Sequence, residues 1–194
     1  VLKGFAEAHK ILKELKPDAL IIADPGIFTY AKEICPEIER HISTQANNVN
    51  YRTFRFWKNQ GATRVVTARE LSIKEIAEID KNIPEDLEIE TFVHGAMCIS
   101  YSGRCTLSNH MSDRDANRGG CSQSCRWKYD LYDMPFGQER KSIHGEVPEE
   151  YSMSAVDMCM IENIPDLIDN GVDSLKIEGR MKSVHYCATV AKVY

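Results

Sequence analysis

The sequence predicts an α/β fold: a partial (β/α) TIM-barrel-type core of parallel strands and helices, with a cysteine-rich insertion and a small antiparallel hairpin. Strand-like apolar runs start near residues 19, 40, 63 and 88, and a helical pattern separates each run from the next. Alternation of strands and helices at this period is typical of parallel βαβ units. From Cys98 onward clustered cysteines interrupt the alternation, which resumes near residue 157 with a helix, a strand and a helix.

The first predicted helix rests on apolar residues at helical spacing that end before Pro17, namely Leu2, Phe5, Leu12 and Leu15. The run A-L-I-I-A-D-P-G then predicts a buried strand that ends at its Pro-Gly pair. A short helix over residues 28–34 and a strand in R-H-I-S-T-Q follow. The next helix, over residues 51–59, ends at Gly61, which suits the left-handed conformation of a C-terminal cap.

The third predicted strand is T-R-V-V-T-A, after which Ser72 and Glu75 form a capping box that starts a helix reaching about residue 82. L-E-I-E-T-F-V-H-G supplies a fourth strand, and D-S-L-K-I-E, near the end of the chain, a fifth. Five parallel strands do not close an eight-stranded barrel. Because the chain also begins on a helix with no strand before it, we expect it to be a piece of a longer (β/α) barrel.

The segment after the fourth strand predicts a different local fold. R-W-K-Y-D-L-Y-D and E-Y-S-M-S-A are expected to form an antiparallel hairpin, joined by a polar loop over residues 134–150. A helix over residues 157–170, capped by Gly171, then restores the βα pattern, and the last helix runs through Val193. The expected organisation is the C-terminal part of a barrel (residues 1–95), a cysteine-rich insertion with the hairpin (96–150) and the last βα elements (151–194).

Composition narrows the class of protein. The hydrophobic share of 43% is ordinary for a globular protein, and no run of 18 apolar residues predicts a membrane span. The first residues are charged and amphipathic, unlike a secretory signal. Seven cysteines without such a signal favour reduced thiols or metal ligands over a disulfide framework. We therefore expect a cytoplasmic protein without a membrane partner; nothing in the sequence predicts its oligomeric state.

Charge is unevenly distributed along the chain. The formal net charge of −5 argues against a general nucleic-acid binder. Between residues 98 and 128, however, the only acidic residues are Asp113 and Asp115. The basic residues of this segment, here called the basic island, are Arg104, Arg114, Arg118, Arg126 and Lys128. The cysteine segment is therefore locally basic within an acidic chain.

The cysteines themselves predict a metal centre. Four of them have the spacing C-x6-C-x15-C-x3-C, and they are Cys98, Cys105, Cys121 and Cys125. Cys159 follows at a distance. Structural zinc and iron–sulfur clusters both take four thiolates. Zinc sites usually show paired C-x2-4-C motifs, and only Cys121 and Cys125 approach that spacing, so the pattern favours a cluster. Cys35 and Cys187 are expected to be ordinary packing residues.

Polar residues that end the predicted strands are candidates for a site, because sites in such folds lie at the carboxyl edge. Thr44, Gln45 and Asn47 follow one strand; Glu90, Phe92 and His94 share one face of another by period-two alternation; Lys176 and Glu178 share a face of the last. The alternative is that some of these polar side chains are hydrogen-bond partners of one another inside a barrel, and we prefer this alternative for His41.

We select His94, Glu178 and Arg180 as candidate catalytic residues. Arg180 is suited to bind a carboxylate or phosphate.

Three long motifs resemble the collagenase-like peptidase family of unassigned catalytic type, over essentially the whole chain. They are E-x-F-V-H-G-A-M-C-I-S-Y-S-G-R-C-x-L-S, R-D-A-N-R-G-G-C-x-x-x-C-R-W and S-L-K-I-E-G-R-M-K-S. Better-understood branches of this family are RNA hydroxylases and anaerobic ubiquinone hydroxylation proteins. The S-G-R-C and R-D-A-N-R-G-x-C motifs look most like the prephenate-dependent tRNA 5-hydroxyuridine branch, which acts at the wobble uridine.

The resemblance implies a [4Fe–4S] cluster whose ligands match Cys98, Cys105, Cys121 and Cys159, with Cys125 able to replace one of them. It also implies tRNA as the partner and prephenate as a possible donor. The basic island would then contact RNA phosphates through Arg114, Arg118, Arg126 and Lys128, while Tyr101 or Trp127 stacks on an unpaired base. Alternatively, these arginines offset the negative charge of the cluster.

The family name records a peptidase, which is an alternative function. The sequence contains neither an H-E-x-x-H zinc motif nor a G-x-S-x-G nucleophile elbow. A Cys–His dyad with His94 or His110 can be drawn, but a thiolate that ligates a cluster is not a free nucleophile. The resemblance thus implies an iron–sulfur-dependent tRNA hydroxylase as the first hypothesis. A peptidase is the second, and a zinc-stabilised non-catalytic binding module is the third.

Overall fold

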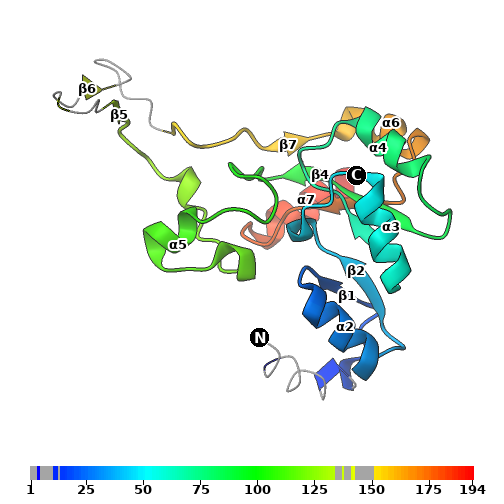
Figure 1. Ribbon diagram of the computed structural model, residues 1–194. Coiled ribbons are helices and arrows are strands. Elements are labelled where there is room, and N and C mark those ends of the chain that lie inside the picture. The colour runs from blue at the N-terminus through cyan, green and yellow to red at the C-terminus, as the bar shows by residue number, and fades with distance from the viewer. Residues whose placement is uncertain (1–3, 5–10, 13, 134–136, 138–140, 143–150) are drawn as a thin grey trace. The chain divides into compact units, whose positions relative to one another are not determined.

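The computed structural model describes residues 4, 11–12, 14–133, 137, 141–142 and 151–194, whose helices and strands are shown in Figure 1. Leu2 and Phe5 of the first predicted helix lie outside these residues, whereas Leu12 and Leu15 are helical as predicted. The chain divides into two compact units. The sheet unit comprises Val1–Gly95, Tyr101–Gly103 and Met158–Tyr194, and the cysteine unit comprises Ala96–Ser100 and Arg104–Asp157.

The sheet unit is built on five parallel strands, as the alternating pattern predicts. Their order is β1 (Ala19–Ile22), β2 (Glu39–Ile42), β3 (Arg64–Val66), β4 (Glu88–Gly95) and β8 (Ser174–Ile177). A short sixth strand, β7 (Met158–Cys159), pairs antiparallel with the end of β4. Among the described strands β1 pairs only with β2, so the sheet is open and no barrel is closed. The mixed α/β fold with a mostly parallel sheet is confirmed.

Side-chain caps define where the main helices of the sheet unit begin. The helices are α2 (Pro25–Ile34), α3 (Tyr51–Gln60), α4 (Ile73–Asp80), α6 (Ile164–Asp169) and α7 (Val184–Val193), with short 3-10 turns η1 (Thr44–Ala46) and η4 (Ile161–Asn163). Asp24, Asn50 and Ser183 each accept a hydrogen bond from the first turn of α2, α3 and α7. Ser72 and Glu75 form the predicted capping box of α4. No helix among the described residues is long and apolar enough to cross a membrane.

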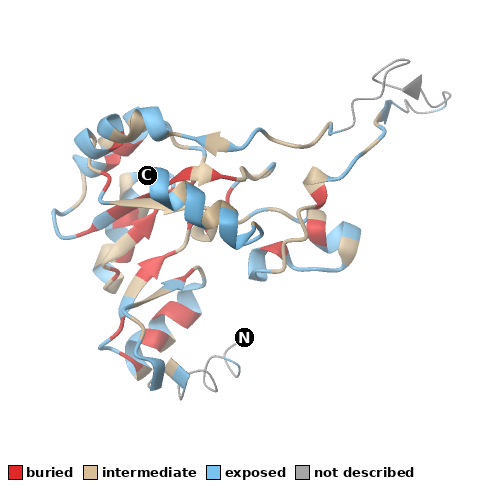
Figure 2. Ribbon diagram, turned by 180° about the vertical axis from the view of Figure 1, so that it is seen from behind, coloured by how far each residue is buried: buried red, intermediate tan, exposed pale blue. Residues whose placement is uncertain are grey.

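The hydrophobic core lies between the parallel strands and the helices of the sheet unit, as the distribution of buried residues in Figure 2 shows. Phe28 of α2 and Phe54 of α3 are almost completely buried against Ile42, Val65 and Ile89 of the strands. Apolar side chains of this size each contribute about 1.5–3 kcal/mol when fully buried. The alternation of strands and amphipathic helices thus supplies the core of this unit.

The hairpin of the cysteine unit differs from the prediction. Its strands are β5 (Tyr132–Asp133) and β6 (Lys141–Ser142), which pair antiparallel. The predicted second strand, E-Y-S-M-S-A, was wrong: its described part begins with a turn at residues 151–153. The pairing that forms closes a much shorter loop, which costs less chain entropy. Most of the predicted loop over residues 134–150 lies outside the described residues.

The predicted helix over residues 157–170 was also wrong at its start, because Met158 and Cys159 form β7 and the α-helix α6 begins only at Ile164. β4 extends well beyond the end of β3 at Val66. The backbone groups on that edge of β4 need hydrogen-bond partners when they are buried. β7 supplies these partners, with Cys159 opposite His94 in the register.

The cysteine unit is held together differently from the sheet unit. Its other elements are one short helix and two 3-10 turns, α5 (Leu107–Ser112), η2 (Ala116–Arg118) and η3 (Ser124–Arg126). Among its described residues, Ala116 is the only buried apolar side chain, whereas the side chains of Ser108 and Ser124 are buried as well. A unit with so little apolar burial depends on polar contacts, or on a bound metal centre, for its stability.

Candidate functional site

A network of charged side chains covers the face of the sheet formed by β3, β4 and β8. Glu90, which is only 6% exposed, accepts from Lys176 at 2.5 Å, from Arg64 at 3.2 Å and from Ser174 at 3.0 Å. Burial raises the pKa of the Glu90 carboxyl, but these hydrogen bonds outweigh the burial and hold it below its usual value. Glu90 and Lys176 are therefore hydrogen-bond and ion-pair partners of each other. This is the structural role that we considered as the alternative to a functional one for polar residues at the strand ends.

Glu178, a predicted catalytic residue, is held by an arginine that was not among the predicted site residues. Arg69 donates to Glu178 at 3.2 Å, and its guanidinium lies 3.9 Å from the centre of the Phe92 ring. The backbone amide of Arg180 donates to the other Glu178 oxygen at 3.4 Å. The side chain of Glu178 thus contacts both Arg69 and the backbone at the start of the Arg180 loop. Arg69 directly follows a predicted strand, the one signal that would have identified it.

His94 does not share a face with Glu90 and Phe92, and this part of the prediction was wrong. The register shifts within β4, so that Phe92 lies beside Lys176 but His94 lies beside Ile177. Such a bulge adds one residue and turns the following side chains to the opposite face. There the His94 ring contacts Tyr194 and Tyr186, and its Nδ1 lies 3.2 Å from the Tyr194 hydroxyl. His94 is therefore on the opposite face of the sheet from the Glu90–Lys176 network.

The turn Tyr101–Gly103 is anchored to the carboxyl ends of the strands. Ser102 is 2% exposed; its amide donates to Glu70 at 2.5 Å, and its hydroxyl accepts from the Arg69 amide and from Thr44, each at 3.3 Å. Gly103 has φ +74° and packs directly on the carbonyl of Gln45. Thr44 and Gln45, which we expected at the edge of the sheet, hold this turn. Tyr101 remains 71% exposed beside it.

Replacing Gly103 by Ala is expected to lower the free energy of unfolding by about 3 kcal/mol, because a Cβ would overlap the Gln45 carbonyl and the positive φ would be strained. Gly61→Ala is the matched control. Gly61 also has positive φ, +101°, but its Cβ would make only ordinary contacts, so about 1 kcal/mol is expected. Urea unfolding followed by circular dichroism measures both. Equal losses of stability would show that the packing at Gly103 is not tight.

The thiols of the cysteine unit lie close enough to influence one another. Burial raises the pKa of the Cys125 thiol, the charge of Arg126 opposes this, and the thiols of Cys98, Cys121 and Cys105 raise the pKa further. Cys121 Sγ accepts from the Gln123 amide at 3.4 Å and from Ser108 Oγ at 3.9 Å. Amide hydrogen bonds of this kind are typical of sulfurs that ligate iron–sulfur clusters.

Among the described residues, no three His, Cys, Asp or Glu side chains are placed to hold a single ion. A [4Fe–4S] cluster takes its thiolates on separate iron atoms, so the thiolates need not converge as the ligands of one ion do. All seven cysteines are free thiols. The cysteines of the cysteine unit are therefore a set of thiol donors of the kind that both iron–sulfur clusters and structural zinc take.

The other three cysteines belong to the sheet unit. Cys159 lies on β7, is exposed, and has its sulfur 3.9 Å from the Tyr194 hydroxyl. Cys35 is fully buried and donates to Ala31 within α2, and Cys187 donates to the carbonyl of Gly179. Cys35 and Cys187 are packing residues, as the sequence predicts.

The members of the basic island differ in their surroundings. Arg118 is exposed and pairs with Asp115 at 3.3 Å, and Arg114 is exposed as well. The ammonium of Lys128 lies 5.6 Å from the Tyr151 ring. Arg126 is mostly buried within the cysteine unit and bonds there to several protein groups. Trp127, beside it in the chain, is 42% exposed.

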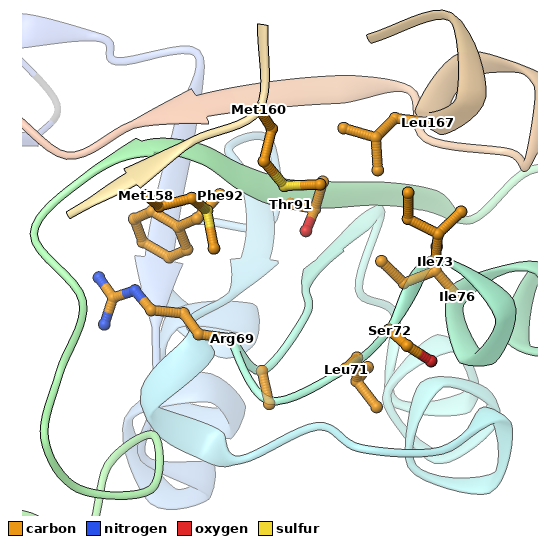
Figure 3. Close-up of a pocket in the computed structure, with 11 residues that line it drawn as sticks. Arg69, Leu71, Ser72, Ile73, Ile76, Thr91, Phe92, Met158, Met160 and Leu167 are labelled. Carbon is orange, nitrogen blue, oxygen red and sulfur yellow. The ribbon is translucent and has the colours of Figure 1, made fainter. Parts of the chain in front are cut away.

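A pocket of about 260 Å³ lies in the sheet unit beside the end of β3 (Figure 3). Ile73 and Leu167 line one part of it, and Phe92 and Met158 line another. Of the residues that line it, only Arg69 is charged. The pocket therefore suits a small group that is mainly apolar, because the guanidinium of Arg69 is already paired with Glu178.

Comparison with known proteins identifies the family to which the chain is similar. A sequence profile described as "Peptidase family U32" matches residues 1–194. The chain is 50% identical over 193 residues to "tRNA hydroxylation protein P1" of Bacillus subtilis (strain 168), covering 100% of this chain and 45% of that protein. It is 40% identical over 177 residues to "23S rRNA 5-hydroxycytidine C2501 synthase" of Escherichia coli (strain K12), covering 91% of this chain and 25% of that protein.

A third relative bears the name "Collagenase", from Porphyromonas gingivalis (strain ATCC BAA-308 / W83); it is 37% identical over 185 residues, which cover 91% of this chain and 43% of that protein. The chain thus spans about half the length, or less, of these relatives. Because the profile matches from the first residue to the last, the chain belongs to peptidase family U32.

Proposed function

We propose that the chain is part of an iron–sulfur-dependent RNA-modifying enzyme that hydroxylates tRNA uridine at the wobble position with a prephenate-derived donor. The observation that carries this proposal is the 50% identity, along the whole chain, to a protein named for tRNA hydroxylation. A second relative, at 40% identity, is named for hydroxylation of an rRNA cytidine. RNA hydroxylation is thus the chemistry that the names of the two relatives share.

The proposed cluster ligands are Cys98, Cys105, Cys121 and Cys159. When bound, a [4Fe–4S] cluster would supply electron transfer, tuned by hydrogen bonds to its sulfurs. The Gln123 amide, which already donates to Cys121 Sγ, would supply one of these hydrogen bonds. Cys125 is the alternative fourth ligand, since its thiol lies within electrostatic reach of the other three in the cysteine unit.

The pocket beside Arg69 is our proposed site for the donor. Prephenate joins carboxylates to an apolar ring, and the pocket joins one guanidinium to an apolar lining. To bind a carboxylate of the donor, Arg69 would exchange its ion pair with Glu178 for that carboxylate, and it would then take the part that we first gave to Arg180. Glu178 and Arg180 remain proposed catalytic residues beside it, whereas His94, on the other face of the sheet, is no longer grouped with them.

The direct test is a modification assay. Anaerobically purified protein is incubated with unmodified tRNA and prephenate, and the digested nucleosides are analysed by mass spectrometry. We expect 5-hydroxyuridine to form, to require prephenate, and to be absent with Cys98→Ala. Arg69→Met should raise the prephenate concentration needed, while Arg52→Met, an exposed arginine on α3, should not. Absence of any hydroxylated nucleoside with iron-loaded protein would refute the proposal.

The peptidase alternative rests on the relative named "Collagenase". It is tested on the same preparations by gelatin cleavage. We expect no cleavage above that of a Cys98→Ala control. Cleavage that survives removal of iron and depends on one cysteine would favour a peptidase.

RNA binding by the basic island has its own prediction. Arg114→Ala with Arg118→Ala should weaken tRNA binding and reduce the slope of log affinity against log salt by about 1 for each phosphate that is no longer neutralised. Iron content should stay normal. The matched control is Arg52→Ala, which should leave the slope unchanged. An unchanged slope together with a fall in iron content would assign these arginines to the cluster's charge instead.

A further inference from the structure

Arg126 bonds to four protein groups of the cysteine unit. Its side chain is 23% exposed. One guanidinium nitrogen donates to the carbonyl of Ala155 at 2.7 Å and to Ser154 Oγ at 3.1 Å. The other donates to the carbonyl of Met97 at 3.1 Å and pairs with the Asp157 carboxylate at 3.0 Å. The terminal nitrogens of the guanidinium are therefore engaged by protein groups of the same unit.

These partners come from the two ends of the cysteine unit. Met97 lies where the chain enters the unit, and residues 154–157 lie where the chain leaves it. They are more than fifty residues apart in sequence, yet Met97 and Asp157 bond to the same nitrogen atom. Arg126 therefore fastens the entering segment to the leaving segment.

The fastened positions adjoin the proposed ligands. Met97 directly precedes Cys98, Arg126 directly follows Cys125, and Asp157 precedes Cys159 by two residues. Two residues of chain span at most about 7 Å between Cα atoms. The position of Asp157 therefore limits that of Cys159, just as the position of Met97 limits that of Cys98.

The energetics of its hydrogen bonds favour a structural role for Arg126 over a contact with RNA. Hydrogen bonds to a charged group contribute about 1.5–3 kcal/mol each, and the fork of the guanidinium matches several acceptors at once. An RNA phosphate would have to displace these partners and leave the carbonyls of Met97 and Ala155 without a donor. In the cysteine unit, where Ala116 is the only described apolar side chain that is buried, such bonds are hard to replace.

We propose that Arg126 is a positioning residue, a guanidinium latch that joins the two ends of the cysteine unit, next to Cys98 at one end and two residues before Cys159 in the chain at the other. The latch itself stands on the contacts of Arg126, while its effect on a metal centre rests on the proposed function. The proposal removes Arg126 from the residues expected to bind RNA phosphate. Arg114, Arg118 and Lys128 keep that proposed role.

The first arm of the test uses metal-free protein, so it does not depend on a cluster. Hydrogen–deuterium exchange followed by mass spectrometry compares peptides that contain residues 96–100 and 154–160 in wild type and variants. Arg126→Ala should speed their exchange about tenfold or more, the factor that corresponds to one charged hydrogen bond. Asp157→Asn, which keeps the shape but removes the ion pair, should give a smaller increase. The matched control, Arg118→Ala, should give none.

The second arm measures iron and sulfide after anaerobic preparation, and the rate at which a chelator removes the iron. Arg126→Ala should hold severalfold less iron than wild type, while Arg126→Lys, which keeps the charge and can reach only some of the acceptors, should fall between them. Any cluster retained by Arg126→Ala should have a lower reduction potential, because a nearby positive charge is removed. If Arg126→Ala does not fold, Arg126→Lys and Asp157→Asn carry both arms.

The outcomes separate the two proposals. Unchanged exchange in Arg126→Ala and Asp157→Asn would overturn the latch, whatever the iron content. A tRNA salt slope that falls in Arg126→Ala but not in Arg126→Lys, with normal exchange in both, would return Arg126 to RNA binding. Wild type without iron would overturn the proposed cluster and leave the latch to be decided by exchange alone.

Discussion

Alanine at Cys98, Cys105 or Cys121 is expected to abolish cluster binding, the largest effect that we predict. Wild type prepared without oxygen should contain about four iron atoms and matching sulfide per chain. Loss of one thiolate leaves one iron without its protein ligand, and the cysteine unit has almost no apolar core to compensate among its described residues. Iron and acid-labile sulfide assays, with the visible absorption of the cluster, measure the loss.

Matched controls come from the cysteines in packing positions. Cys35→Ala and Cys187→Ala should keep normal iron, because these thiols bond to backbone carbonyls of the sheet unit. Cys159→Ala and Cys125→Ala decide the fourth ligand: we expect the former to lose the cluster and the latter to keep it. The reverse result would make Cys125 the ligand. Stoichiometric zinc without sulfide in wild type would instead support a zinc-stabilised module.

Replacing Glu90 by Ala is expected to lower the free energy of unfolding by about 3 kcal/mol, the low end for breaking a buried ion pair, since Lys176 and Arg64 are partly exposed. The matched control is Glu88→Ala. Glu88 also pairs with Arg64, but its side chain is 48% exposed, so less than about 1 kcal/mol is expected. Urea unfolding at neutral pH measures both variants. Equal losses of stability would show that the Glu90 network is solvated like an ordinary surface pair.

The same network predicts a dependence on pH. Because the folded pKa of Glu90 lies below its unfolded value, the network stabilises the fold at neutral pH. That stabilisation should begin to disappear as pH falls past the unfolded value, about 4.3 for a glutamate, and should be lost below the folded pKa. Unfolding of wild type and Glu90→Gln across this range measures it. Wild type should show the steeper decline; parallel curves would contradict the assignment.

The sequence by itself determined the parallel α/β layout, since strand and helix periodicities and caps are local signals. The capping box of Ser72 and Glu75 and the cap at Gly61 involve residues close in sequence, so both could be predicted and both form. The metal centre that the cysteine spacing predicts is likewise a local signal, and it stays a prediction. The motifs of the family could also be recognised in the sequence, because each is a continuous stretch of the chain.

Tertiary structure decided which residues meet. The face of His94 depends on a bulge in β4, which arises from pairing with β8 more than seventy residues later. β7 replaces the predicted start of a helix because the exposed edge of β4 needs hydrogen-bond partners. Arg69 reaches Glu178, 109 residues away, and Arg126 joins segments on either side of it. A charged side chain pairs with the acceptors that the fold brings close to it. Sequence spacing does not predict these partners, because they are far away along the chain.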